Sequence, residues 1–317
     1  MSNNYKFIDL CAGTGAFTNA FHRYNNFECV FANDFEKNSK TIYDLNHSNN
    51  YFKLKDINEI DVTTIPNHDI LCAGFPCQSF SIAGKKKGFE DSRATVFWKI
   101  IEILKHHNPN IVILENVKNL KSHDNGNTFK IIEEELKKAG YYVKYNVLDT
   151  SSITNVPQHR ERIYIVCFKD KNLYDTFKFD FSIVANKPII DFLEAIPLSK
   201  YYYTNSVKVY DEIRDNVVKH INENVLYQYR RYYVRENKSN CCPTLTANMG
   251  TGGHNVPILM DDNGIRKLTP RECFNLQGFP TTYKLPNISD GGLYKLAGNA
   301  VSVPVINLIV DKIAGML

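Results

Sequence analysis

The sequence contains no apolar run of the roughly 18 residues needed to cross a bilayer, and its first residues, Met1 to Phe7, form no basic-plus-apolar leader. These absences argue against a membrane partner and against secretion, so we expect a cytoplasmic protein. The eight cysteines form no C-x-x-C pair, and three of them, Cys29, Cys72 and Cys167, lie in apolar runs. This pattern disfavours a zinc knuckle and is typical of free thiols in a reducing compartment.

No internal repeat is visible, and the content of hydrophobic (43%) and charged (23%) residues excludes a disordered or fibrous chain. A length of 317 residues favours one large domain and one smaller domain. The net charge of +4 alone indicates no more than a solvated surface. However, residues 200–245 carry eight Lys and Arg against five acids, interleaved with eight tyrosines. Basic residues mixed with aromatic ones are typical of nucleic-acid binding.

The first half of the chain alternates short β-rich runs with amphipathic helical stretches, which predicts an α/β fold with a parallel sheet covered on both faces. Apolar spacing predicts helices over Thr95 to His107, over Asn127 to Ala139 and, near the C-terminus, over Val301 to Ile313. Six strands are expected, at Lys6 to Leu10, Glu28 to Ala32, Asp69 to Gly74, Asn110 to Glu115, Tyr142 to Leu148 and Arg162 to Phe168.

The alternation of strands and helices ends after about Pro188, where the sequence becomes rich in Tyr and Asn and then in glycine. We therefore expect a first domain over residues 1–188, completed by 295–317, and a smaller, mostly β or irregular domain over 189–271. Residues 272–294 would form the hinge.

A glycine turn follows the first expected strand, in the segment F-I-D-L-C-A-G-T-G from Phe7 to Gly15, and Asp34 ends the next strand. Such a turn lets a nucleotide approach the backbone, and an acid after the second strand can bond ribose hydroxyls. Thr18 stands where the third glycine of a dinucleotide site would be, which favours an adenosyl ligand instead. A purely structural turn is the alternative.

The segment G-F-P-C-Q-S-F-S, from Gly74 to Ser81, follows a buried strand at the end where α/β sheets present their active sites. Cys77 could be a packed core thiol. Its place after a proline, in a polar loop flanked by glycine, instead favours an exposed and activated thiolate.

Two more segments place charged residues beside expected strands. Glu115, in L-E-N-V, ends one strand and could be a helix cap or a solvated loop residue. Arg160 and Arg162, in Q-H-R-E-R-I-Y-I-V, precede another strand and could form surface salt bridges.

Together these segments resemble the DNA (cytosine-5)-methyltransferases, in particular the short enzymes of bacterial type II restriction-modification systems. The F-x-D-L-x-A-G-x-G, G-F-P-C-Q-x-F-S, E-N-V, Q-x-R-E-R-I-Y and G-N-A-V segments follow the family's order, from Phe7 to the C-terminal helix. The resemblance implies a Rossmann-like S-adenosylmethionine-dependent domain with a smaller target-recognition domain. It also implies transfer of a methyl group from S-adenosyl-L-methionine to C5 of a cytosine flipped out of duplex DNA.

By this resemblance Cys77 is the nucleophile that adds to cytosine C6, a step that needs its thiolate. Glu115 would hold N3 and the exocyclic amine of the flipped base, Arg162 would meet O2, and Arg160 would support them. This chemistry requires no metal.

The resemblance also implies a cofactor site. Phe7 and Phe35 would contact the two faces of the adenine, Asp34 the ribose, and Asp56 with Ile57 the adenine edge. The remaining contacts would come from Asp9, Gly13, Gly15, Pro76, Asn299 and Val301. The sequence departs from the family at Cys11 and Ala16, and Asp34 is one methylene shorter than the usual glutamate.

Duplex DNA is the implied partner, bound by a monomer, with any cognate restriction endonuclease encoded separately. Residues 85–93 match the family's loop that closes over DNA, although a solvated charge run would look the same. Residues 189–271 correspond to its target-recognition domain, in which Thr244 matches a Thr-Leu marker. The glycine-rich segment 246–257 suits contact with base edges, or forms a structural turn. The expected DNA contacts are Gln78, Lys85, Lys86, Lys87, Arg93, Arg231, Thr244, Asn248 and His254.

Three rival functions stay open. A tRNA cytosine-5 methyltransferase is disfavoured by the size of the expected target-recognition domain. A catalytically silent DNA-binding protein is disfavoured because Cys77, Glu115 and Arg162 are all present. A nicotinamide-dependent dehydrogenase has only the glycine turn in its favour.

Overall fold

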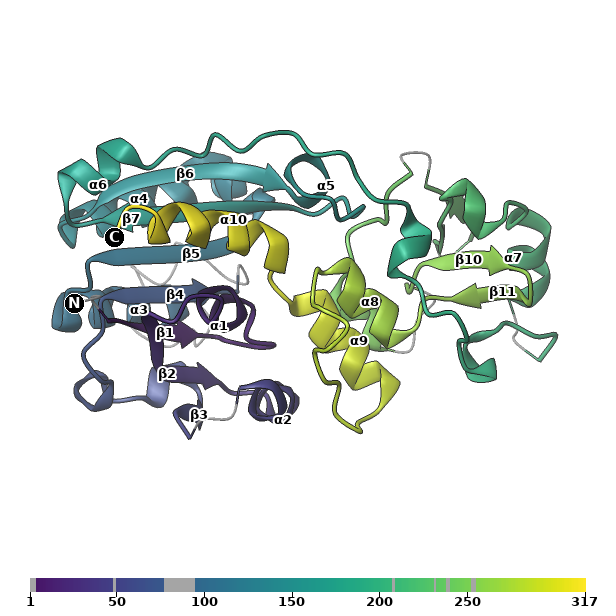
Figure 1. Cartoon of the computed structure of the whole chain (residues 1–317), viewed down its shortest axis with the longest axis horizontal. Coiled ribbons are helices and arrows are strands. Elements are labelled where there is room, and N and C mark those ends of the chain that lie inside the picture. The colour runs from purple at the N-terminus through teal and green to yellow at the C-terminus, as the bar shows by residue number, and fades with distance from the viewer. Residues whose placement is uncertain are drawn as a thin grey trace. The chain divides into compact units, whose positions relative to one another are not determined.

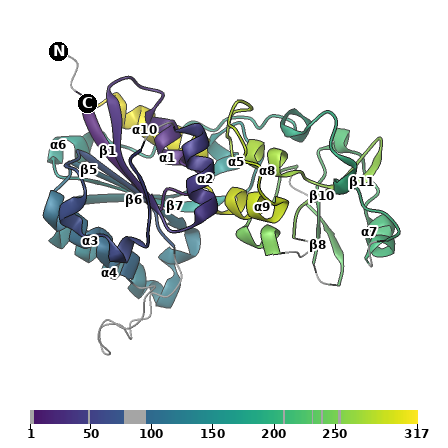
Figure 2. The ribbon, with the colours of Figure 1, turned by 90° about the horizontal axis from the view of Figure 1, so that it is seen from below.

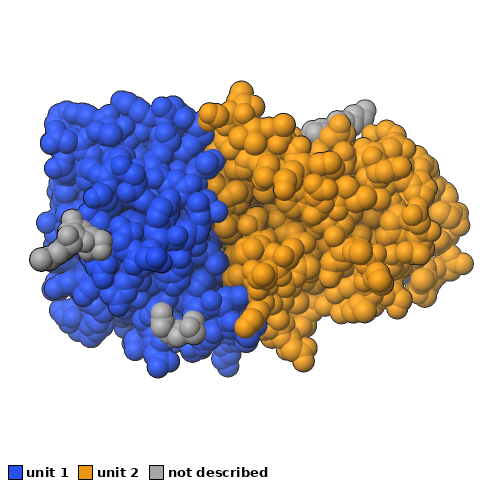
Figure 3. All heavy atoms as spheres, viewed as in Figure 1, with its two compact units in different colours: residues 1–148, 161–181, 306–317 blue, residues 149–160, 182–305 orange. Residues whose placement is uncertain are grey.

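The structure is a computed structural model that describes residues 4–47, 50–76, 95–206, 209–230, 232–237, 240–251 and 255–317. The chain divides into two compact units (Figure 3). Unit 1 comprises residues 1–148, 161–181 and 306–317, and unit 2 comprises 149–160 and 182–305. Residues 149–160 and 295–305 thus cluster with unit 2, whereas the functional limits at 188 and 295 stay predictions.

Unit 1 is built on a seven-stranded sheet with the order β3-β2-β1-β4-β5-β7-β6 (Figure 1). Its strands are β1 (Tyr5–Leu10), β2 (Phe27–Asp34), β3 (Phe52–Leu54), β4 (Ile70–Gly74), β5 (Ile111–Val117), β6 (Tyr142–Asp149) and β7 (Glu161–Phe168). All six expected strands are present, and the three-residue β3 is additional.

The expectation of a parallel sheet needs one correction. Strands β1 to β5 pair in parallel, but β7 pairs with β5 antiparallel. Strand β7 follows its neighbour β6 after residues 150–160 alone, which is shorter than the usual crossover between parallel strands. The chain therefore turns back on itself at this edge of the sheet.

Helices cover both faces of this sheet (Figure 2). Helices α3 (Thr95–His107) and α4 (Asn127–Lys138) pack on one face, where alternate residues such as Ile8, Leu71 and Leu114 join the main core cluster. The intervening side chains of each strand point to the opposite face, beside α1 (Ala16–Phe21) and α10 (Val303–Ala314). Helices α2 (Lys37–Asn46) and α6 (Lys171–Thr176) complete the unit.

Unit 2 contains a four-stranded antiparallel sheet with the order β11-β10-β8-β9. Ile213, Val217, Tyr227, Ile258 and Ile265 form its small core. The sheet's strands are β8 (Tyr227–Tyr229), β9 (Val234–Glu236), β10 (Ile258–Asp261) and β11 (Gly264–Lys267), and the helices of the unit are α5 (Thr150–Ile153), α7 (Tyr210–Asn216), α8 (Pro270–Leu276) and α9 (Asp290–Asn299). Short strands and irregular connections agree with the loss of alternation in the sequence.

One segment, Asp290–Ala314, is apolar and long enough to cross a membrane by composition alone, with a mean hydropathy of 1.4 in its most apolar window. That window is 67% buried, and the segment consists of α9 and α10 with non-helical residues 300–302 between them. Helices of a protein core meet the same criterion, so this is weak evidence for a membrane span.

Candidate active site

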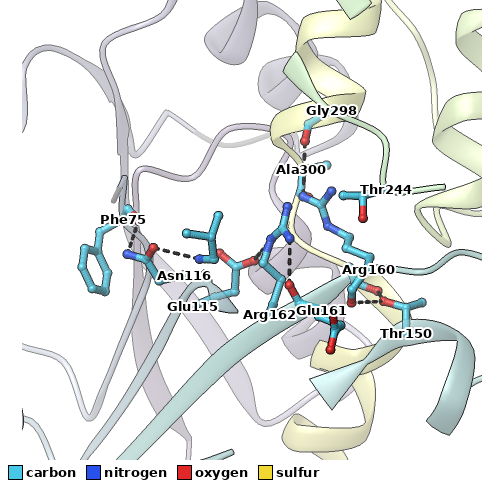
Figure 4. Close-up of polar contacts among 12 residues, drawn as sticks. Phe75, Glu115, Asn116, Thr150, Arg160, Glu161, Arg162, Thr244, Gly298 and Ala300 are labelled. Carbon is cyan, nitrogen blue, oxygen red and sulfur yellow. Dashed lines mark hydrogen bonds and ion pairs between the residues drawn. The ribbon is translucent and has the colours of Figure 1, made fainter. Parts of the chain in front are cut away.

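Glu115 and Arg162 form an ion pair on the face of the unit 1 sheet opposite α3 and α4 (Figure 4). The Arg162 Nε lies 3.3 Å from Glu115 Oε1, and both side chains are largely buried, with 13% and 9% exposed. Glu115 lies opposite Tyr164 across the β5–β7 ladder, and Arg162 is two residues from Tyr164, so all three side chains share one face. The structure thus brings these two expected site residues together in a largely buried ion pair, and Arg162 does not form the surface salt bridge that was its alternative.

The residue after Glu115, Asn116, connects β5 to the segment that follows β4. Asn116 Nδ2 donates to the Phe75 carbonyl at 2.8 Å, and both residues are buried. Asn116 Oδ1 accepts the Val117 amide at 2.8 Å, so both ends of the side-chain amide are bonded. The carboxyl end of β4 is thereby fixed beside Glu115, up to the exposed Pro76.

Several expected site residues lie outside the described residues: Cys77, Gln78, Lys85, Lys86, Lys87, Arg93, Arg231 and His254. The seven described cysteines are free thiols. Burial raises the pKa of the thiol in every one of them, which disfavours the thiolate. Each of these seven is therefore a poor nucleophile.

The glycine turn after β1 is held by two buried acids. Asp34 Oδ2 accepts the Gly13 amide at 2.9 Å, and its Oδ1 accepts the Glu36 amide at 2.9 Å, so the acid ties the turn to the end of β2. Asp9 Oδ2 accepts from the Thr18 hydroxyl at 2.8 Å and from the Thr18 amide at 3.3 Å. Thr18, which replaces the third glycine of a dinucleotide site, thus bonds the acid of β1.

Asp9 is fully buried, and among the described residues no donor bonds its Oδ1. Burial raises the pKa of Asp9 to about 7, against the opposing effect of the Thr18 hydrogen bonds. Burial also raises the pKa of Asp34. Gly13 and Gly15 adopt positive φ angles of 51° and 71°, and a Cβ on Gly15 would lie 2.5 Å from His47 Nε2. A buried carboxylate oxygen that no described donor bonds can accept a hydrogen bond from a cationic amine of a ligand.

The aromatic residues assigned to adenine differ in exposure. Phe35 follows β2 and is 67% exposed, which leaves its ring available for stacking. Phe7 is fully buried and stacks on Phe21 with 4.7 Å between ring centroids. In this structure the Phe7 ring therefore packs in the core, and its expected adenine contact stays a prediction. Asp56 is exposed and caps a short 3-10 helix, whereas the Ile57 side chain is in the core.

Arg160 belongs to unit 2 and bonds three backbone carbonyls. Its Nη1 donates to Leu245 O at 2.9 Å, and its Nη2 donates to Gly298 O at 3.2 Å and Ala300 O at 2.7 Å (Figure 4). With 2% of its surface exposed, Arg160 is neither a surface salt bridge nor open to a substrate. Its observed contacts are those of a structural support.

The remaining expected residues of unit 2 lie near these carbonyls. The Thr244 hydroxyl donates to His159 O at 2.5 Å, and Asn248 is exposed on a 3-10 helix (Ala247–Thr251). Asn299 is exposed at the end of α9, with Val301 two residues beyond. A Cβ on Gly298 would lie 2.1 Å from the Thr246 carbonyl carbon, so only glycine lets α9 approach this segment.

Sequence reasoning assigned no role to several residues that build the site. Thr18 was noted only because it replaces a glycine. Asn116 and Gln158 belong to recognised motifs, but no hydrogen bond was predicted for either. Gln277 had no signal, because a buried glutamine that bonds other polar groups has no characteristic spacing.

The glycine turn after β1, the acids near the ends of β1 and β2 and the buried Glu–Arg pair at the end of β5 together indicate an α/β fold whose candidate site lies at the carboxyl ends of the parallel strands. The structure is similar to that of the S. pombe Dnmt2 methyltransferase, with a TM-score of 0.75, 22% identity and 99% of both chains covered. At this identity the likeness concerns the fold.

The model of the C-5 cytosine-specific DNA methylase family matches residues 5–315. The chain belongs to this family, as its motifs predicted. It is similar to Type II methyltransferase M.Bsp6I of Bacillus sp. (strain RFL6), with 45% identity over 96% of both chains. It is also similar to Type II methyltransferase M.HhaI of Haemophilus parahaemolyticus, with 37% identity over 98% of this chain and 95% of the relative. The chain is thus an enzyme of the DNA cytosine-5 methyltransferase class.

Proposed function

We propose that the chain transfers a methyl group from S-adenosyl-L-methionine to C5 of a cytosine that is flipped out of a short, specific duplex DNA sequence. The observation that carries this proposal is the buried Glu115–Arg162 pair, next to which Asn116 bonds Phe75, two residues before Cys77 in the sequence. A flipped base must be bonded along its Watson–Crick edge, and an acid next to a guanidinium offers both an acceptor and a donor there.

In the proposed reaction, the Cys77 thiolate adds to C6 of the cytosine, and the electron pair that this addition places on C5 accepts the methyl group. The protonated Glu115 carboxyl gives its proton to N3 as the thiolate adds, and the resulting carboxylate accepts from N3–H and from the exocyclic amine. Arg162 donates to O2, so that both side chains stabilise the addition product. Loss of the C5 proton to a base then expels the Cys77 thiolate and restores the double bond. The bound cofactor supplies an electrophilic methyl group on a sulfonium sulfur.

The residues of unit 1 fit this cofactor. Asp9 offers a buried oxygen for the amine, Asp34 can accept from the ribose hydroxyls, and the exposed Phe35 ring can stack on adenine. Asp56 and Pro76 are exposed at the same carboxyl ends of the parallel strands. Asn299 and Val301 of unit 2 complete the proposed set.

Target recognition is proposed for residues 189–271. Arg230 and Arg235 are exposed near the short strands β8 and β9 and, with Arg231, would contact phosphates. The exposed Asn248, together with His254, would contact base edges. Arg231→Ala should therefore weaken binding to all DNA sequences and lower the salt slope by about one. Asn248→Ala should reduce discrimination at particular base pairs by roughly 1 to 3 kcal/mol. Unchanged discrimination after replacement of segment 246–257 would remove this assignment.

Two relatives are Type II methyltransferases, and we propose that this chain likewise works as a monomer in a restriction-modification system with a separately encoded endonuclease. The test of the proposed function is incorporation of labelled methyl groups into duplex DNA and into tRNA. Incorporation into DNA alone is expected. Incorporation into tRNA alone would favour the RNA enzyme, and no incorporation into either would favour a silent DNA-binding protein.

A further inference from the structure

Leu245, in the proposed recognition domain, has both of its backbone polar groups bonded by side chains rather than by a strand. Its amide donates to Gln158 Oε1 at 3.2 Å, and its carbonyl accepts from Arg160 Nη1 at 2.9 Å. Gln158 and Arg160 are two residues apart and precede β7 directly. Gln158 is fully buried, so its hydrogen bonds are not in exchange with water.

The Gln158 side chain also forms hydrogen bonds to a second segment of unit 2. Gln158 Nε2 donates to Leu276 O at 2.6 Å and to Gln277 Oε1 at 3.2 Å. Gln277 is also fully buried and donates from its Nε2 to Ala297 O at 2.6 Å. The hydrogen bonds thus run from Leu245 through two glutamine amides to α9.

The orientation of the Gln158 amide is fixed by its surroundings. The Leu276 carbonyl requires a donor, and the Leu245 amide requires an acceptor, so a rotated amide would lose both bonds. Arg160 provides a parallel connection, from Leu245 to the carbonyls of Gly298 and Ala300. These carbonyls flank Asn299, and Val301 follows them.

We propose that Gln158 is a positioning residue that holds the Thr244–Leu245 segment for sequence recognition and, through Gln277, couples that segment to the cofactor-binding residues Asn299 and Val301. The inference rests on the proposed function, in which the first segment contacts DNA and the second contacts the cofactor. A ligand that orders either end lowers the cost of ordering the other, because the buried amides have one satisfied arrangement.

The test compares Gln158→Leu, Gln277→Leu and the control Asn275→Leu. Asn275 lies in α8 next to Leu276 and donates to Phe192 O at 3.0 Å, so its replacement also removes a side-chain hydrogen bond but leaves Leu245 untouched. For each protein, the dissociation constant of the methylation site and of a single-base variant is measured with and without S-adenosylhomocysteine. If Gln158→Leu does not fold, Gln158→Asn replaces it, because it keeps the amide but shortens its reach.

We expect S-adenosylhomocysteine to tighten DNA binding of the unaltered protein by about fivefold or more. Gln158→Leu should reduce the coupling ratio to about one and lower the site discrimination by about tenfold. Gln277→Leu should reduce the coupling ratio and keep most of the discrimination. Asn275→Leu should keep both ratios. Absence of coupling in the unaltered protein, or equal ratios in Gln158→Leu and Asn275→Leu, would overturn the inference. Failure of the unaltered protein to methylate DNA would instead overturn the proposed function.

Discussion

Arg162 Nε lies 3.3 Å from Glu115 Oε1, and the two side chains reach each other across the β5–β7 ladder. Both are largely buried, and removal of one partner from such a pair usually costs about 3 to 5 kcal/mol, because the other charge stays buried alone. Glu115 also lies beside Gly74 at the carboxyl end of β4, and the neighbouring Asn116 bonds Phe75. The stability of the Glu115–Arg162 pair and its proposed chemistry therefore depend on the same two charges.

Glu115→Gln should slow methyl transfer by about 10²-fold or more, the usual effect of removing an electrostatic stabiliser. Glutamine keeps the size and a hydrogen-bonding oxygen, so the affinity for S-adenosylmethionine should change little. Single-turnover kinetics together with a cofactor titration measure both. A loss of cofactor affinity in proportion to the rate would show that Glu115 serves the cofactor and not the base.

Asp9→Asn should remove a pH dependence of stability in the cofactor-free protein. Burial raises the pKa of Asp9 from 3.8 to about 7, so the folded state binds more protons than the unfolded state between these values. The Asp9 contribution to the free energy of unfolding is thus most favourable at low pH and is lost as pH rises towards 7. At 1.36 kcal/mol per pKa unit, this loss is about 4 kcal/mol at most.

Denaturant unfolding at pH 5 and pH 8 measures this effect. The Asp9→Asn variant should be more stable than the unaltered protein at pH 8 and should lose less stability between the two values. Equal changes in both proteins would mean that Asp9 is already ionised throughout this range.

His68→Gln should reduce the loss of stability that the unaltered protein shows as pH falls. Burial lowers the pKa of His68 from 6.5 to about 4, and its Nδ1 lies 2.8 Å from Pro66 O. The stability that comes from the neutral ring is fully present above pH 6.5 and is lost as pH falls towards 4. The variant should therefore lose less stability than the unaltered protein over that range, in thermal unfolding measured at half-unit steps. His106→Gln, at an exposed position near the end of α3, is the control, and the same slope in both variants would refute the prediction.

Gly298→Ala should lower the free energy of unfolding by about 1 to 3 kcal/mol, the usual cost of overpacking. The new Cβ would meet the backbone of Thr246 at 2.1 Å and that of Ala247 at 2.4 Å, so the segment next to Leu245 must move. Gly315→Ala is the control, because its nearest atom would be 3.4 Å away. Urea unfolding compares the two, and equal losses would show that the segment adapts without cost.

The sequence predicted most of unit 1 because its signals are local. Alternating apolar runs marked the six long strands, and Glu115 and Arg162 could be placed at strand ends because each adjoins an apolar run, although their ion pair was not predicted. The reversed direction of β7 escaped notice, since a strand has the same pattern in either direction. The stacking of Phe7 on Phe21 could not be predicted, because the local sequence around a buried aromatic residue does not identify its packing partner.

Unit 2 was less accessible to this reasoning. Its side-chain hydrogen bonds join residues far apart in the chain, such as Gln158 with Gln277 and Arg160 with Ala300. No periodic pattern in the sequence predicts such bonds. Arg160 stood beside Arg162 in one motif, yet it bonds backbone carbonyls of unit 2 while Arg162 pairs with an acid of unit 1.

The most direct test of the central claim is bisulfite sequencing of DNA from a host that expresses the chain, alongside the same host expressing Cys77→Ala. The account predicts protected cytosines at one short recurring sequence with the unaltered protein and none with Cys77→Ala. Purified Cys77→Ala should still bind that sequence, and duplex DNA with 5-fluorocytosine at the site should trap the unaltered protein through Cys77, because fluorine at C5 blocks the elimination step. Protection that persists in Cys77→Ala, or a trapped adduct on another cysteine, would contradict the account.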